Sequence, residues 1–210
     1  VAGGAPRHGV LIDGSGQLLT GNGVATTITG TDLSGNDEVG VRIANTQVDL
    51  SGGGDVTITS NRRVEIVGQL VPGAGALTVR AGTTLTLDNV DFFGAPSSAL
   101  FRGDTALLAT GSINFESNTP ITLQSPKLTL GGADSSLTVA SLGSVRLLTD
   151  ALESNLTDIF ADGVGTTIAI AGYDGQSNVT TFSAPDGMPG LNPGRGRWLI
   201  YARTDNVPEG

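Results

Sequence analysis

The chain has 210 residues, 32 of them glycine, and its 20 acids against 11 bases give a formal net charge of −9. This much glycine argues against a helical protein, because glycine inside a helix costs roughly 1 kcal/mol relative to alanine. The acidic charge and scattered bases argue against a nucleic-acid partner. The absence of cysteine excludes disulfides and thiolate sites, and without a run of 18 apolar residues no membrane insertion is expected.

Two segments near the amino terminus recur further along the chain at nearly the same offset. Gly9–Ile12 matches Gly40–Ile43, and Thr27–Thr29 matches Thr57–Thr59. Self-similarity at a fixed period, here about 30 residues, indicates a repeat architecture. The polar loop 31–38 is predicted to hold the residues by which this period exceeds a shorter basic coil.

Pairs of apolar residues separated by one residue continue along the chain, often eight residues apart, with Gly-, Asn-, Asp- or Ser-rich turns between them. This alternation is the strand period, in which both apolar side chains face one side. Three such strands per coil predict a coil of roughly 24 residues. We therefore predict an all-β, right-handed parallel β-helix rather than a meander of hairpins. The following residues are expected to point inward and stack in rows: Val48, Leu50, Val56, Ile58, Val64, Ile66, Leu77, Val79, Leu85 and Leu87.

The coil pattern is assigned to residues 1–182 and is clearest over 9–147. Residues 148–162 have apolar side chains at helical spacing, so they are expected to form either a short helix or two irregular strands. The stretch 183–196 is rich in proline and glycine and is predicted to be a loop. A final strand within 197–210 is expected to pack on the last coil or to lead into a further domain.

Two segments resemble the repeats and a terminal element of filamentous-haemagglutinin-type exoproteins. Leu77–Leu87 resembles their repeat cassette, and Gly194–Tyr201 resembles their Gly-Arg-Trp-Leu-(Val/Ile)-Tyr element. The resemblance implies a secreted or cell-surface adhesin, a virulence factor exported by two-partner secretion through an outer-membrane partner. Its receptor would be a host or bacterial surface molecule or glycan. The secretion domain of that family is not evident, so the chain is expected to be a distal piece of a longer protein, monomeric as a fragment.

Catalytic chemistry has few candidates in this sequence. His8 is the only histidine, which leaves no partner motif for a Ser-His-Asp set. A carbohydrate-active β-helix would need paired carboxylates, for which Asp49 with Asp55 and Asp88 with Asp91 are the candidates, although turn acids are ordinarily solvated. We expect no enzyme, no cofactor and no metal. The single Gly52–Asp55 resemblance to a calcium-binding nonapeptide is imperfect.

Two kinds of surface site remain as hypotheses. Asn155 and Asn178 begin Asn-x-Thr sequons and are candidate glycosylation sites. Phe92 and Phe93 are candidates for an exposed binding loop. Because these two phenylalanines are adjacent, one is expected to face the core, and the other is either exposed for binding or covered by the loop.

Overall fold

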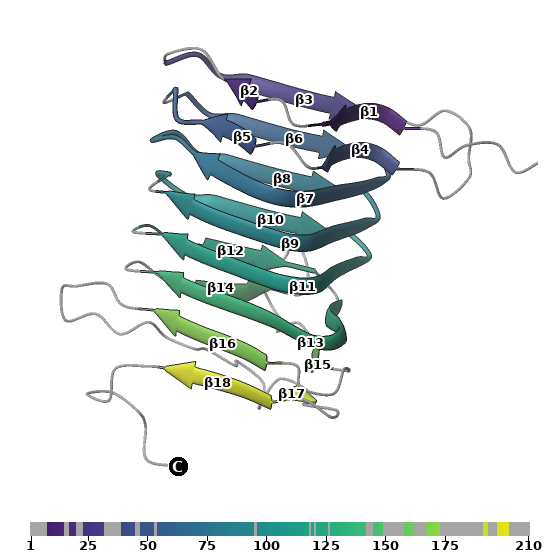
Figure 1. Ribbon diagram of the computed structural model, residues 1–210, viewed down its shortest axis with the longest axis vertical. Helices are drawn as coiled ribbons and strands as arrows, with labels where there is room; N and C mark the ends of the chain where they lie inside the picture. Colours follow the sequence, from purple (N-terminus) through teal and green to yellow (C-terminus); the bar gives the residue numbers. More distant parts are fainter. Residues whose placement is uncertain are drawn as a thin grey trace, which may run out of the picture.

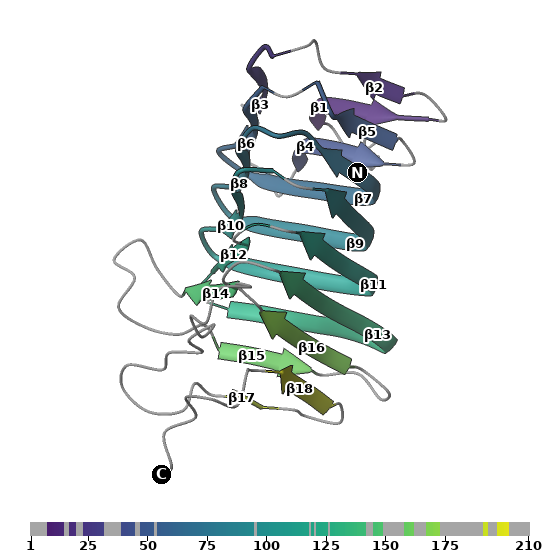
Figure 2. The ribbon, with the colours of Figure 1, turned by 90° about the vertical axis from the view of Figure 1, so that its left-hand side faces the viewer.

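The computed structural model is a parallel β-solenoid whose coils stack along one axis (Figures 1 and 2). Among the residues that it describes it contains strands and no helix, and so no helix able to span a membrane. The described residues are 8–14, 17–19, 23–31, 39–44, 47–52, 54–94, 96–117, 119, 121–125, 127–141, 145–148, 158–161, 167–172, 191–192 and 197–201.

The strands form two parallel sheets, of twelve and six strands. The twelve-stranded sheet contains β1 (His8–Asp13), β2 (Gln17–Leu19), β4 (Val39–Ala44), β5 (Gln47–Leu50), β7 (Arg63–Pro72), β9 (Thr84–Gly94), β11 (Ala106–Ser117), β13 (Lys127–Ser141), β15 (Asp158–Ala161), β16 (Thr167–Gly172), β17 (Leu191–Asn192) and β18 (Arg197–Tyr201). The six-stranded sheet contains β3 (Thr26–Gly30), β6 (Val56–Ser60), β8 (Leu77–Ala81), β10 (Ala99–Gly103), β12 (Ile121–Gln124) and β14 (Val145–Leu148).

Each central coil has three faces. A long strand of the larger sheet, such as β7, bends once and so contributes two faces, and a short strand of the smaller sheet, such as β8, contributes the third. Figure 2 shows the short strands along one side of the stack and the long strands wrapping the others. The prediction of three strand segments per coil is thereby confirmed.

The length of a coil differs between the middle and the ends of the solenoid. In the middle, Val64 is the register partner of Leu85, and Leu85 is the partner of Leu107. At the amino-terminal end the separation is longer, because Val10 is the partner of Val41. These end coils have the spacing that the sequence repeats indicated, and the central coils are close to the expected length.

The core consists of apolar side chains stacked in rows inside the coils. Of the ten residues predicted to point inward, nine are at most 3% exposed, and the tenth, Leu50, has a side chain outside the described set. The strands that carry them pair in parallel and in register. The alternation of apolar residues therefore located the core correctly.

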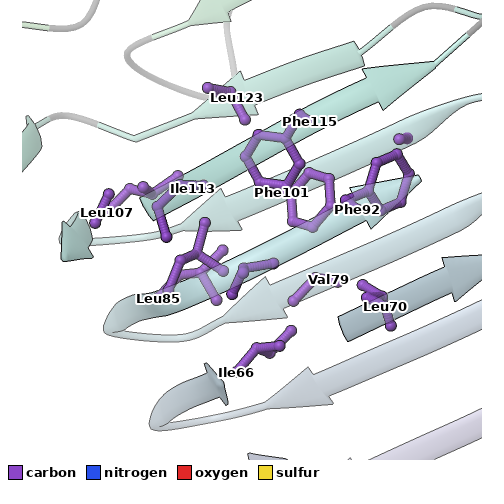
Figure 3. Close-up of a cluster of buried hydrophobic side chains, with 14 of the residues drawn as sticks. Ile66, Leu70, Val79, Leu85, Phe92, Phe101, Leu107, Ile113, Phe115 and Leu123 are labelled. Atoms are coloured by element: carbon purple, nitrogen blue, oxygen red, sulfur yellow. The ribbon is translucent and has the colours of Figure 1, made fainter. Parts of the chain in front are cut away.

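Three phenylalanines from consecutive strands fill the centre of the solenoid (Figure 3). The ring centroids of Phe92 and Phe101 are 5.4 Å apart at nearly right angles, and those of Phe101 and Phe115 are 4.6 Å apart. Edge-on and tilted contacts of this kind are favourable beyond the buried area alone. Phe92 is fully buried in β9, so it is the member of the Phe92–Phe93 pair that faces the core, and it is not part of an exposed binding loop.

The bend in each long strand occurs at a residue with positive φ. These residues occupy successive coils and are Gly68, Asn89, Gly111 and Asp134. A Cβ at Gly111 would lie 2.3 Å from Asn89 Oδ1, so a larger residue there would displace the Asn89 side chain. The Asn89 side chain accepts a hydrogen bond from the Ser112 amide at 3.2 Å, which joins two coils at the bend.

The carboxyl-terminal strands continue the stack. Of residues 148–162, for which a helix or irregular strands were expected, Leu148 ends β14 and 158–161 form strand β15, while 149–157 lie outside the described residues. The expected loop 183–196 contains the short strand β17, which pairs with β15. Strand β18 pairs in parallel with β16. The Trp198 segment thus joins the larger sheet.

A charge placed in the core row should unfold the solenoid, whereas the same charge on the adjacent outward position should not. Val79 is fully buried and Thr78 points outward. We expect Val79→Asp to lower the free energy of unfolding by roughly 3–5 kcal/mol, because an unpaired carboxylate would be buried. Thr78→Asp should change it by less than about 0.5 kcal/mol. Urea denaturation of both variants measures this, and equal effects would contradict the assignment of faces.

Candidate binding surface

The register of the solenoid aligns outward-facing residues as it aligns the core. On the six-stranded sheet, Thr59 of β6 is in register with Arg80 of β8, and Arg80 with Arg102 of β10. Register partners on parallel strands are neighbours, with strands about 4.8 Å apart. Two arginines that are one whole coil apart in sequence therefore lie side by side on the surface.

These two arginines share one carboxylate. Asp104, in the turn after β10, accepts a hydrogen bond from Arg102 Nε at 2.6 Å and another from Arg80 at 3.2 Å. The Arg80 side chain is 52% exposed, which leaves much of its guanidinium open to solvent. The three residues form a surface ion cluster with one positive charge in excess.

A second cluster of the same form lies on the twelve-stranded sheet. Glu65 of β7 is in register with Arg42 of β4, and its carboxylate is 3.7 Å from the Arg42 guanidinium and 4.0 Å from that of Arg63. Again one carboxylate lies between two arginines. The Nε atoms of Arg42 and Arg63 are buried and have no hydrogen-bond partner.

The two clusters flank one corner of the solenoid, where the chain passes from the smaller sheet to the larger. Turns 61–62, 82–83 and 104–105 stack there, joined by hydrogen bonds such as Thr83 N to Arg62 O at 3.4 Å and Asp104 N to Ala81 O at 3.0 Å. We call this region the arginine corner, defined by Arg42, Arg62, Arg63, Arg80 and Arg102 with Glu65 and Asp104.

The arginine corner is electropositive on an acidic chain. Among the described residues, the two ion clusters together hold four arginines and two carboxylates, a sum of +2, against −9 for the whole sequence. In the sequence these bases look scattered. Knowledge of the coil length would have brought Arg80 and Arg102 together, because they are one central coil apart in sequence and are register partners.

The two neighbouring arginines alter the pKa of Asp104. Partial burial acts to raise the pKa of this carboxyl, but hydrogen bonds from Arg102 and Arg80, together with their positive charges, lower it below its ordinary value. Asp104 is therefore ionised over the whole neutral range, and the ion cluster that it organises persists there.

The carboxylates considered for catalysis are engaged in turn and inter-coil contacts. Asp49 accepts a hydrogen bond from the Ser51 amide at 2.9 Å, and hydrogen bonding by the Ser51 side chain together with this amide lowers the pKa of Asp49. Asp55 accepts one from the Ala76 amide of the next coil at 2.8 Å. Both contacts hold the backbone at turns.

Asp88 and Asp91 have corresponding roles near the bend of β9. Asp88 accepts hydrogen bonds from Asn89 and from the hydroxyl of Thr110, each at 3.0 Å, and Asp91 accepts one from Asn114 at 3.3 Å. Thr110 and Asn114 belong to the next long strand, β11. Both acids therefore join neighbouring coils, as ordinary structural acids do.

The other candidate site residues from the sequence lie outside the arginine corner or outside the described residues. His8 begins β1 and is partly buried. Phe93 lies in β9, with a side chain outside the described set, and Asn155 and Asn178 lie outside the described residues. Within the described part of the chain, no three His, Cys, Asp or Glu side chains are grouped to hold a metal ion.

Comparison of this chain with protein-family models, with curated proteins and with solved structures found no match.

The charge on Asp104 should stabilise the fold at neutral pH and lose this effect in acid. A carboxyl whose pKa is lowered on folding contributes stability above its unfolded pKa, and that contribution disappears as the pH falls through the folded pKa. We expect Asp104→Asn to melt below the unchanged protein at about pH 6, with the difference closing towards about pH 2.

The matched control is Thr105→Asn in the same turn, which removes no charge and should leave the melting temperature nearly unchanged at both pH values. A melting difference for Asp104→Asn that is the same at both pH values would show that its ionisation contributes nothing.

Proposed function

We propose that this chain is a structural and adhesive segment of a secreted bacterial surface protein, which mediates attachment to host or neighbouring cells. The observation that carries the proposal is the in-register stack of coils. It presents aligned rows of side chains along the solenoid axis, on a scaffold whose core rows are continuous through the central coils.

The geometry supports adhesion because a repeated surface suits a repeated or extended partner. Each outward row places one side chain per coil at about 4.8 Å intervals, and solenoids commonly use such extended surfaces for binding. The arginine corner is the part of the described surface where charge is concentrated in this way.

The sequence resemblance supplies the rest of the proposal. Leu77–Leu87, which resembles the adhesin repeat cassette, forms β8, the following turn and the start of β9. Export by two-partner secretion, an outer-membrane secretion partner and a location outside the cell follow from that resemblance alone. A host or bacterial surface receptor or glycan is the corresponding partner.

We further propose that the chain is not an enzyme. This is supported by the contacts of Asp49, Asp55, Asp88 and Asp91, each of which holds a turn or joins two coils. A general acid or base needs a carboxyl free to exchange a proton with substrate.

Adhesion can be tested with beads coated with the purified chain. We expect coated beads to attach to cultured epithelial cells or to bacterial cells, and soluble chain to compete for attachment. Beads coated with Val79→Asp, in which the core row is broken, provide the control for dependence on the fold. Attachment no greater than for this control would contradict the proposal.

The same preparation should be incubated with a panel of acidic and neutral polysaccharides. We expect no sustained release of reducing ends or unsaturated sugars. Turnover that is lost in Asp88→Asn or Asp91→Asn would overturn the proposal in favour of a carbohydrate-active β-helix, a polysaccharide lyase or hydrolase.

A further inference from the structure

We propose that the arginine corner binds a linear polysaccharide whose repeating sugars carry carboxylates, lying along the solenoid axis. The inference rests on the proposed adhesive function and names the chemical class of its partner. Its basis is that the fold gathers four arginines that are spread along the sequence from Arg42 to Arg102 into two ion clusters.

The corner already shows the contact that such a ligand would make. In each ion cluster one carboxylate, that of Asp104 or Glu65, lies between two guanidinium groups. A guanidinium has five N–H donors in a planar fork that matches a carboxylate. One internal carboxylate for two arginines leaves donors and positive charge for a second, external carboxylate.

The cluster around Glu65 contains hydrogen-bond donors that have no partner. Its ion pairs, at 3.7 and 4.0 Å, are longer than hydrogen bonds, and the Nε donors of Arg42 and Arg63 are unpartnered. Donors that are buried without a partner are energetically unfavourable. Reorientation of these guanidiniums toward a bound carboxylate would satisfy them.

The spacing of the arginines favours a polymer over a single anion. Arg42 lies on β4, Arg62 and Arg63 at the start of the next coil, Arg80 on β8 and Arg102 on β10. Arg63 and Arg80 belong to the coil of β7 and β8, Arg42 to the coil before it and Arg102 to the coil after it, so the guanidiniums are spread over three coils that are about 4.8 Å apart along the axis. A chain with a charge on each repeating sugar can contact several of them together, so that weak individual contacts add up.

Polygalacturonate is the probe, because its methyl ester is the same polymer with the carboxylates capped. We expect the full chain to bind immobilised polygalacturonate in biolayer interferometry, not to bind the methyl-esterified polymer, and to bind less tightly as salt is raised. Arg80→Gln/Arg102→Gln should weaken binding by roughly tenfold. Arg80→Lys/Arg102→Lys, which keeps the charge but loses the planar fork, should have an intermediate effect.

The matched control is Arg146→Gln/Arg197→Gln, which removes the same charge from β14 and β18, outside the corner. It should change affinity by less than about twofold. Arg42→Gln/Arg63→Gln tests the second cluster in the same way as the first. Melting curves establish that each variant is folded. If Arg80→Gln/Arg102→Gln is not folded, the lysine variant and the second cluster decide the question.

Several results would overturn the inference. Equal binding to the esterified polymer, or equal losses for the corner and control variants, would exclude a carboxylate site at this corner. Binding of dextran sulfate or duplex DNA without binding of polygalacturonate would assign the corner to a different anion. If coated beads still attach to cells in any of these cases, the adhesive function survives and only the partner class is wrong.

Discussion

A strand can stack in register on the strand below it only if the coil between them closes at the right length. In the centre of this solenoid that length varies little, as the partners Val64 with Leu85 and Ile113 with Leu137 show. Three tight features make the closure possible: the two turns of each coil and the bend of the long strand at a positive-φ residue such as Gly111. The buried rows, the cluster of phenylalanine rings and the parallel hydrogen bonding all depend on each coil closing at this length.

The same constraint organises the surface. Residues one coil apart become neighbours whether they face inward or outward, so a modest number of charges can be concentrated at one corner of an acidic chain. Glu65 is the register partner of Arg42 and also contacts Arg63, whereas Asp104 lies in a turn and bonds Arg102 and its register partner Arg80. The carboxylates near the bend, such as Asp91 with its contact to Asn114, are used instead to join coils. On the described surface, polar residues thus serve two purposes: some hold neighbouring coils together, and the ion clusters of the arginine corner carry more positive than negative charge.

Much of the fold could be predicted from the sequence, because alternating apolar and polar residues in a strand show which side chains are buried. Val56 and Ile58, or Leu85 and Leu87, could be assigned to the core from their spacing, and the two amino-terminal repeats matched the observed register. Strand β10 is harder to find in this way, because one of its inward residues, Ala99, is small and has little hydrophobic signal. Which of the adjacent Phe92 and Phe93 faces the core could not be read from the sequence, because β9 bends at Asn89 and the alternation of buried residues is interrupted there. The arginine corner could not be found without the register, since no two of its members except Arg62 and Arg63 are adjacent in sequence.

Cysteine cross-linking tests the parallel, in-register stack most directly, because the chain contains no cysteine of its own. Thr57 and Thr78 are register partners on adjacent strands β6 and β8, and Leu100 is the partner of Thr78 one strand further on. Strands about 4.8 Å apart place paired Cα atoms within the range of a disulfide, whereas twice that separation does not. We predict rapid disulfide formation in Thr57→Cys/Thr78→Cys and none in Thr57→Cys/Leu100→Cys under mild oxidation. Efficient cross-linking of the second pair but not the first would contradict the stacking on which the core, the arginine corner and the proposed function all rest.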